Sequence, residues 1–169
     1  MRPHKSSVPG SAPDGHLAPR PGRPRIVYSR DGTTGPANAQ FEPARLMIVE
    51  DDYLIASEME GALRDAGFEV VGIAESAEQA VELASAHGPL LAIMDIRLSG
   101  GRDGADAAID LFSLHGIRCV FATAHHTAET RKRAKPANPL AWLAKPYTMQ
   151  ALLVVVRNAV QDVRASNET

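Results

Sequence analysis

Acidic, hydroxyl and ammonium side chains follow four of the five short apolar runs in this sequence. They are Glu50, Asp51 and Asp52 after the first run, Asp95 after the third, Thr123 after the fourth and Lys145 after the fifth. Carboxylates that gather in a partly buried cleft repel one another unless a cation compensates their charge. Two or three carboxylates with several waters are a usual environment for Mg²⁺, and a lysine adds a further positive charge. Together these groups suit the handling of a phosphoryl group.

Each of these side chains has a chemical and a structural interpretation. Asp95 is the candidate nucleophile, because carboxylates can form aspartyl-phosphate intermediates. Thr123 could hydrogen-bond to a phosphoryl oxygen and Lys145 could neutralise one, but a strand-end threonine or a Lys-Pro turn is often only structural. The pair Asp51-Asp52 could equally cap a helix. The convergence of all four strand ends on one chemistry favours the functional interpretation.

The elements that must position these groups can be predicted from the apolar pattern. The five apolar runs are continuous rather than alternating, which is typical of strands buried on both faces. They cover residues 46–49, 70–73, 90–94, 117–121 and 140–143. Stretches with helical spacing separate them and predict helices over residues 53–66, 77–87, 105–115, 127–135 and 148–164. Ser76 is the expected N-cap of the second helix, with Gly88 at its end.

Strands that alternate with helices predict an α/β domain, which we place at residues 44–165. The expected fold is a three-layer, doubly wound, five-stranded parallel sheet with right-handed crossovers. In such sheets, ligands bind beyond the carboxyl ends of the strands, at the point where the strand order reverses. The polar residues that follow the strands are therefore expected to meet at one edge.

The segment before this domain has a different composition. Residues 1–43 hold 8 of the 12 prolines and carry a net charge of +3. Such a segment cannot bury enough apolar surface to offset its ordering entropy, which predicts a disordered tail. It could be a basic arm that contacts a partner or nucleic acid, or a solvated extension. Residues 166–169 are expected to form a short C-terminal tail.

Composition excludes several classes of protein. The 169 residues carry a net charge of −2, which argues against a dedicated nucleic-acid binder. Cys119 is the only cysteine, so a disulfide scaffold is excluded. No apolar run approaches the ~20 residues that span a bilayer, and no secretory signal is visible. We expect a soluble, cytoplasmic protein that does not bind membranes.

With these residues in place, the sequence resembles a response-regulator receiver domain, the phosphoacceptor half of two-component phosphorelay signalling. The resemblance extends over about residues 45–163, and a Gly-rich third loop is similar to stand-alone receivers of the sensory and stress-response type. The matching segments are Leu46-Met47-Ile48-Val49-Glu50-Asp51, Met94-Asp95-Ile96-Arg97-Leu98 with Asp103-Gly104 downstream, Phe121-Ala122-Thr123-Ala124, and Trp142-Leu143-Ala144-Lys145-Pro146-Tyr147.

The resemblance implies a flavodoxin-like (βα)5 fold and a role for each matching residue. Asp95 would be the phosphoacceptor, and the bond between Lys145 and Pro146 is cis in many relatives. The implied Mg²⁺ ligands are the side chains of Asp51 and Asp95, a water held by Glu50 and the backbone carbonyl of Arg97. Thr123 would be the switch hydroxyl and Lys145 the partner of a phosphoryl oxygen. Trp142 takes the aromatic output-coupling position, usually Tyr or Phe, where its bulk puts the inward swing in doubt.

A receiver of this kind would accept a phosphoryl group from a sensor histidine kinase or a phosphotransfer protein. It would signal by contact with a downstream protein partner, with homodimerisation left open, and would catalyse only its own phosphorylation and dephosphorylation. No DNA-binding or enzymatic output domain is expected after the last helix. Residues 127–163, with a basic cluster near their start, are the expected output face.

Three alternatives can be compared with this interpretation. A Mg²⁺-dependent phosphohydrolase could also use Asp95 as nucleophile, but haloacid-dehalogenase-type enzymes place a second Asp where Arg97 stands. A nucleotide-binding domain would need a glycine-rich phosphate loop after the first strand, and none is present. A degenerate receiver that acts only as a scaffold is disfavoured by the intact set of acidic residues.

Overall fold

The fold was analysed in a computed structural model that describes residues 42–167. The predicted tail of residues 1–43 lies outside the described residues except for its last two, and so do residues 168–169. The strands are β1 (Arg45–Val49), β2 (Glu69–Ala74), β3 (Leu91–Met94), β4 (Arg118–Thr123) and β5 (Ala141–Ala144). The helices are α1 (Tyr53–Asp65), α2 (Ala77–His87), α3 (Gly104–His115), α4 (Ala128–Ala134) and α5 (Met149–Asn167), with a 3₁₀ turn, η1 (Lys135–Ala137), after α4.

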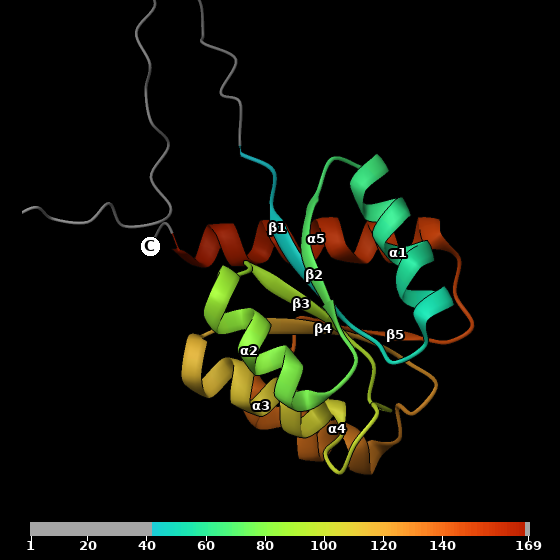
Figure 1. The fold of residues 1–169 in the computed structure, drawn as a ribbon, viewed down its shortest axis with the longest axis vertical. Helices are drawn as coiled ribbons and strands as arrows, with labels where there is room; N and C mark the ends of the chain where they lie inside the picture. The colour runs from blue at the N-terminus through green and yellow to red at the C-terminus, as the bar shows by residue number, and fades with distance from the viewer. Residues whose placement is uncertain (1–41, 168–169) are drawn as a thin grey trace, which may run out of the picture. The chain divides into compact units, whose positions relative to one another are not determined.

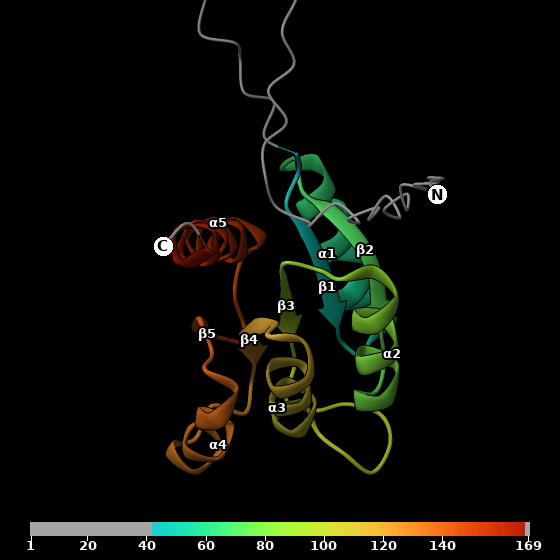
Figure 2. The same ribbon diagram turned by 90° about the vertical axis from the view of Figure 1, so that its left-hand side faces the viewer.

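The five strands form one parallel sheet in the order β2-β1-β3-β4-β5. The order reverses between β1 and β3, which run side by side although α1, β2 and α2 separate them in the chain. Figure 1 shows α1 and α5 on one side of the strands and α2, α3 and α4 on the other, and Figure 2 shows the same arrangement from the side. The predicted three-layer, doubly wound α/β fold is confirmed.

Each face of the sheet has its own apolar core. On the first face, the fully buried Met47, Met94 and Phe121 pack against small residues of α2 and α3. On the second face, Ile48 and Ile93 pack against α1 and α5. Neighbouring strand residues thus point to opposite faces, and both are buried, which explains the continuous apolar runs in the sequence.

The helices begin and end where their local sequence provides capping groups. Asp52 caps α1, because its side chain accepts the backbone N–H groups of Leu54 and Ile55. Ser76 caps α2 as predicted, and Gly88 ends it in the left-handed conformation with φ of 54°. Asp52 is therefore accounted for by its structural role.

Most boundaries agree with the sequence-based expectation to within one residue, and two differ by two or three residues. Helix α5 continues to Asn167 rather than ending at Arg164, because no glycine or proline interrupts the residues between them. Strand β4 continues through Thr123, which pairs with Ala144 of β5, so Thr123 is the last residue of the strand and does not follow it. None of the helices within residues 42–167 is long and apolar enough to cross a membrane.

The start of α3 lies unusually close to the segment that follows β3. The backbone N–H of Gly104 donates to the carbonyl of Ile96 at 2.8 Å. A Cβ atom on Gly104 would overlap the carbonyl oxygen of Asp95 and lie 2.8 Å from its carbonyl carbon. Because both groups belong to the backbone, neither can turn aside. Gly104 therefore lets α3 begin directly against the backbone of Asp95.

We expect Gly104→Ala to lower the free energy of unfolding by about 2–3 kcal/mol, the cost of forcing extra volume into a packed backbone contact. Gly101→Ala is the matched control, because a Cβ there would meet nothing within 4 Å, and we expect a change within about 0.5 kcal/mol. Urea unfolding of both variants measures the difference. A Gly104 variant as stable as the wild type would contradict the close approach.

Candidate functional site

The carboxyl ends of β1 and β3 bring Glu50 and Asp95 side by side. Val49 and Met94 are paired in the sheet, and the residue after each is an acid. The backbone N–H of Asp95 donates to the carbonyl of Val49 at 2.9 Å, which extends the pairing by one more residue. The strand reversal between β1 and β3 therefore places two carboxylates at one point of the sheet edge.

Lys145, which follows β5, reaches both carboxylates. Its Nζ donates to Glu50 Oε2 at 2.7 Å and to Asp95 Oδ2 at 2.7 Å. The side chains of Glu50 and Asp95 are 2% and 10% exposed, and that of Lys145 is 19% exposed. Three residues from three strand ends thus form one shielded, charge-assisted cluster.

The surroundings shift the pKa values of this cluster. Burial raises the pKa of the Glu50 carboxyl above its usual 4.5, although the hydrogen bond and charge of Lys145 oppose the rise. Partial burial works to lower the pKa of Lys145, but its hydrogen bonds to Asp95 and Glu50 outweigh that effect and raise it above 10.5. Lys145 therefore remains an ammonium group throughout the physiological pH range.

Asp51 lies at the same edge but makes different contacts. Its carboxylate is exposed and accepts a hydrogen bond from the Ser99 hydroxyl at 3.2 Å. Among residues 42–167, no three acidic, histidine or cysteine side chains are grouped as the ligands of a metal ion are. The side-chain geometry therefore does not by itself define the Mg²⁺ site predicted from the sequence, and that site stays a prediction.

The chemistry of the donor set nevertheless fits a hard divalent cation. Glu50, Asp51 and Asp95 supply oxygen atoms, which are the ligands that Mg²⁺ prefers. Lys145 binds two of these three carboxylates, and its single positive charge leaves the cluster with an excess of negative charge. Mg²⁺ would compensate that excess of negative charge.

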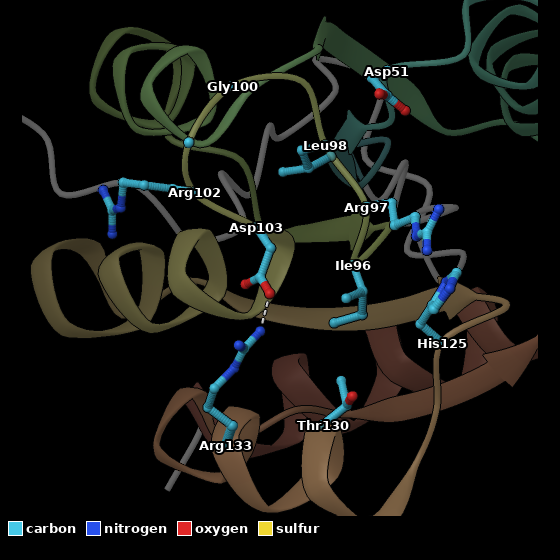
Figure 3. A pocket seen from close by; sticks show the side chains of 11 residues that line it. Asp51, Ile96, Arg97, Leu98, Gly100, Arg102, Asp103, His125, Thr130 and Arg133 are labelled. Carbon is cyan, nitrogen blue, oxygen red and sulfur yellow. Dashed lines mark hydrogen bonds and ion pairs between the residues drawn. The ribbon is translucent and has the colours of Figure 1, made fainter.

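Arg97, the fourth implied ligand, contributes backbone groups to the site. Its N–H donates to Asp95 Oδ1 at 3.3 Å, so both oxygens of the Asp95 carboxylate have partners. Its side chain is exposed and extends away from the β3 end, with His125 nearby (Figure 3). The backbone N–H of Arg97 thus contacts the Asp95 carboxylate, and the role of its carbonyl as a Mg²⁺ ligand stays a prediction.

Thr123 is fully buried, and its hydroxyl is used by its own loop. Thr123 Oγ1 accepts the backbone N–H of His125 at 3.0 Å, while the Thr123 carbonyl accepts the backbone N–H of Lys145 at 3.0 Å. The structure therefore places Thr123 on the strand next to Lys145, with its side chain engaged in the β4–α4 turn. The bond between Lys145 and Pro146 is cis.

Trp142 forms an aromatic pair on the neighbouring strands. Its ring stacks on Phe121 with the centroids 4.2 Å apart and the planes inclined by 22°. On its other side, the guanidinium carbon of Arg131 lies 4.9 Å from the ring centroid, within cation–π range. Trp142 is thus half-buried between a core phenylalanine and an arginine of α4.

A cavity of about 470 Å³ lies between the β3–α3 loop and α4. Figure 3 shows Asp51 and Arg97 at its upper and right-hand sides, with Arg133 reaching from α4 below toward Asp103. Its walls are largely polar and charged, unlike a pocket for an apolar ligand. The residues that line it are Asp51, Ile96, Arg97, Leu98, Gly100, Gly101, Arg102, Asp103, His125, Thr130 and Arg133.

Three residues near the site, Ser99, Asp103 and Gly104, have no role predicted from the sequence, and Arg133 is expected only as part of the basic cluster of the output face. Ser99 binds Asp51, Gly104 contacts the Asp95 backbone, and Asp103 forms an ion pair with Arg133. The capping role of Asp103 could have been read from its place before a helical stretch, since its side chain accepts two backbone N–H groups of α3. The sequence carries no signal for the partner of Arg133, because the two residues of the pair are thirty positions apart.

Taken together, these features define an open, doubly wound α/β domain with an acid–lysine cluster at its topological switch point. Residues 46–157 match the family model of the response regulator receiver domain. The chain is 38% identical over 133 residues to the transcriptional regulatory protein PdtaR of Mycobacterium tuberculosis. The aligned region covers 79% of this chain and 64% of PdtaR. The chain is 32% identical over 117 residues to the phyllosphere-induced regulator PhyR of Methylorubrum extorquens. That aligned region covers 68% of this chain and 43% of PhyR.

Solved structures agree with this match. The signal receiver domain of a modulated diguanylate cyclase from Desulfovibrio desulfuricans G20 aligns with a TM-score of 0.68 and 31% identity, over 73% of this chain and 98% of that domain. The chain belongs to the response regulator receiver domain family, as its sequence motifs predict. It spans less than two thirds of the length of PdtaR and PhyR.

We expect Lys145→Met to lower the free energy of unfolding by about 3 kcal/mol at neutral pH, because it leaves the Glu50 and Asp95 carboxylates buried without their cation. The loss should shrink as the pH falls toward 4.5. Burial already raises the pKa of Glu50 above that value, and removing Lys145 raises it further. The folded variant then binds more protons than the unfolded chain, so acid favours folding.

Urea unfolding of the Lys145 variant at several pH values measures this effect. Lys132→Met is the matched control, because Lys132 is an exposed lysine of α4 outside the acidic cluster, and it should change little at any pH. A deficit for the Lys145 variant that does not vary with pH would argue against two buried carboxylates that depend on one ammonium group.

Proposed function

We propose that this protein accepts a phosphoryl group on Asp95 from a sensor histidine kinase or a phosphotransfer protein. The observation that carries the proposal is the position of Asp95 at the switch point of the sheet. Its carboxylate lies beside Glu50 and shares the ammonium group of Lys145 with it. The proposal also rests on membership of the receiver family. The phosphorylated domain would then signal by binding a downstream protein, in a cytoplasmic two-component system.

The transfer would form one bond and break another. An oxygen of the Asp95 carboxylate forms a bond to phosphorus while the bond from phosphorus to the donor's imidazole nitrogen breaks, and that electron pair remains on the imidazole. Lys145 stays beside the new acyl phosphate and pairs with one of its oxygens. Because Glu50 shares this ammonium group, Lys145 is held in place while the charge on Asp95 changes.

Mg²⁺ would be held by Glu50, Asp51 and Asp95 with the backbone carbonyl of Arg97, and it would supply neutralisation of the phosphoryl oxygens. Thr123 is the proposed switch residue. Its hydroxyl accepts the hydrogen bond from the His125 N–H, and the hydroxyl hydrogen can still be donated to a phosphoryl oxygen. A shift of the Thr123 side chain toward the phosphoryl group would act on the β4–α4 turn that this bond closes.

Phosphorylation by acetyl phosphate tests the phosphoacceptor directly. We expect purified protein with Mg²⁺ and acetyl phosphate to gain one phosphoryl group, detected by intact mass, that is stable in acid and lost in base. Asp95→Asn should abolish the gain, because an amide oxygen is a poor nucleophile. Asp65→Asn, which changes an exposed acid at the end of α1, is the control and should leave labelling unchanged.

Undiminished labelling of the Asp95 variant would refute the assignment. A phosphohydrolase would give a different result, since it would turn over many equivalents of a phosphomonoester rather than stop at one bound group. A histidine kinase as donor, in place of acetyl phosphate, then tests the proposed class of partner.

Magnesium binding is tested without any phosphoryl donor. We expect Asp51→Asn to weaken the binding of Mg²⁺ at least about tenfold. Even the mutation of a residue that only hydrogen-bonds to a metal ligand commonly lowers metal affinity about 10–100-fold. Asp52→Asn is the matched control, because asparagine caps a helix as well as aspartate does and the two positions are adjacent. Calorimetric titration with MgCl₂ provides the measurement. Equal affinities in the wild type and the Asp51 variant would remove Asp51 from the proposed ligand set.

A further inference from the structure

Helix α4 is tied to two different parts of the domain by two arginines. Arg133 forms an ion pair with the Asp103 carboxylate in the β3–α3 loop, and Figure 3 shows it reaching from α4 across to that loop. Arg131 instead covers the ring of Trp142 on β5, 4.9 Å from the ring centroid. Because the two arginines are two positions apart on a helix, they leave it in different directions.

The loop end of this connection is fixed with respect to the phosphoacceptor. One oxygen of the Asp103 carboxylate accepts the backbone N–H groups of Ala105 and Asp106 at 3.0 and 3.2 Å, which holds Asp103 at the start of α3. The next residue, Gly104, lies against the backbone of Asp95. A displacement of Asp103 would therefore move the start of α3, and that segment cannot move without changing the position of the Asp95 backbone.

The other end is fixed to the sheet. Trp142 stacks on Phe121, and Phe121 lies on β4 two residues before the proposed switch residue Thr123. Arg131 thus contacts an aromatic pair that is anchored in two strands. Helix α4 joins this pair to the loop.

Packing between α4 and the loop is incomplete on the side where Arg133 crosses. The cavity of about 470 Å³ separates them there, and Leu98 and Thr130 face it from opposite sides. Elsewhere, Ala134 packs into the core that α3 shares. A helix that is packed at one side and bridged by an ion pair at the other can change position at small cost.

From these contacts we propose that Arg133 is a positioning residue that couples the phosphoacceptor loop to Trp142 through α4. Phosphorylation of Asp95 changes the environment of Trp142 by way of the ion pair between Asp103 and Arg133. The inference rests on the proposed function, since it needs Asp95 to be the phosphoacceptor. The ion pair is half-exposed, with Arg133 and Asp103 side chains 51% and 31% exposed, so it contributes little to overall stability and acts on a local equilibrium.

Fluorescence of Trp142, the only tryptophan of the chain, tests the coupling. Full-length protein is treated with Mg²⁺ and acetyl phosphate, its phosphorylation is measured by intact mass, and the quenching of Trp142 by acrylamide is compared before and after. We expect phosphorylation to change the quenching constant in the wild type. The change should shrink about two- to fivefold in Arg133→Gln and in Asp103→Asn, in line with the loss of one exposed ion pair.

The variants are chosen to separate coupling from simple damage. Asparagine at position 103 still caps α3, so only the ion pair is lost, and Arg133→Lys should restore most of the response. The double variant should respond no less than either single variant, because both remove the same interaction. Arg102→Gln, which breaks an ion pair with Asp110 at the same cavity, is the control and should respond like the wild type.

Equal Trp142 responses in the wild type and the Arg133 variant, at equal phosphorylation, would overturn the proposal. So would a wild type that is phosphorylated without any change at Trp142, or additive losses in the double variant. If even the wild type takes up no phosphoryl group, the proposed function fails instead. Hydrogen exchange without a donor tests separately whether Arg133 holds the loop, because Arg133→Gln, unlike Arg102→Gln, should speed exchange of the Gly104 N–H about two- to fivefold, and an unchanged rate would overturn the coupling.

Discussion

The site depends on one ammonium group held between two shielded carboxylates. Taking Glu50 and Asp95 out of water is costly, and placing them side by side adds repulsion. Lys145 makes this arrangement tolerable, because it donates to both at 2.7 Å while its own pKa stays high. The balance is incomplete, since burial still raises the pKa of Glu50 and Asp51 adds a further charge nearby. An acidic cluster that is only partly neutralised is suited to bind further positive charge.

The topology of the sheet makes this cluster possible. Glu50 and Asp95 are neighbours because β1 lies next to β3 rather than beside β2 alone, and the sheet order reverses at that point. Lys145 comes from β5 at the edge of the sheet, two strands away from β3, and a long side chain is needed to span that distance. A shorter residue at position 145 could not serve both acids. The fold thus supplies the positions, and side-chain length completes the cluster.

Much of this could be predicted from the sequence, because it depends on local patterns. Continuous apolar runs indicated buried strands, and Ser76 indicated a helix start, since both signals lie within a few residues. The sharing of Lys145 by two acids, and the closeness of Gly104 to the Asp95 backbone, could not be predicted. Each depends on distances between elements that are far apart in the chain. The sequence predicts an end of α5 at Arg164, but the helix continues to Asn167, because residues 165–167 include no glycine or proline that would stop it.

The aromatic position illustrates how one substitution changes the route by which a site can act on a surface. Trp142 presses on Phe121 with its centroid 4.2 Å away, and Phe121 is fully buried in the core. An inward swing of the larger ring would have to displace that core residue, which close packing resists. Movement of Arg131 on the outer face meets no such barrier, because it displaces only a cation–π contact. The structure therefore favours α4, rather than rotation of Trp142 itself, as the part of the output face that responds.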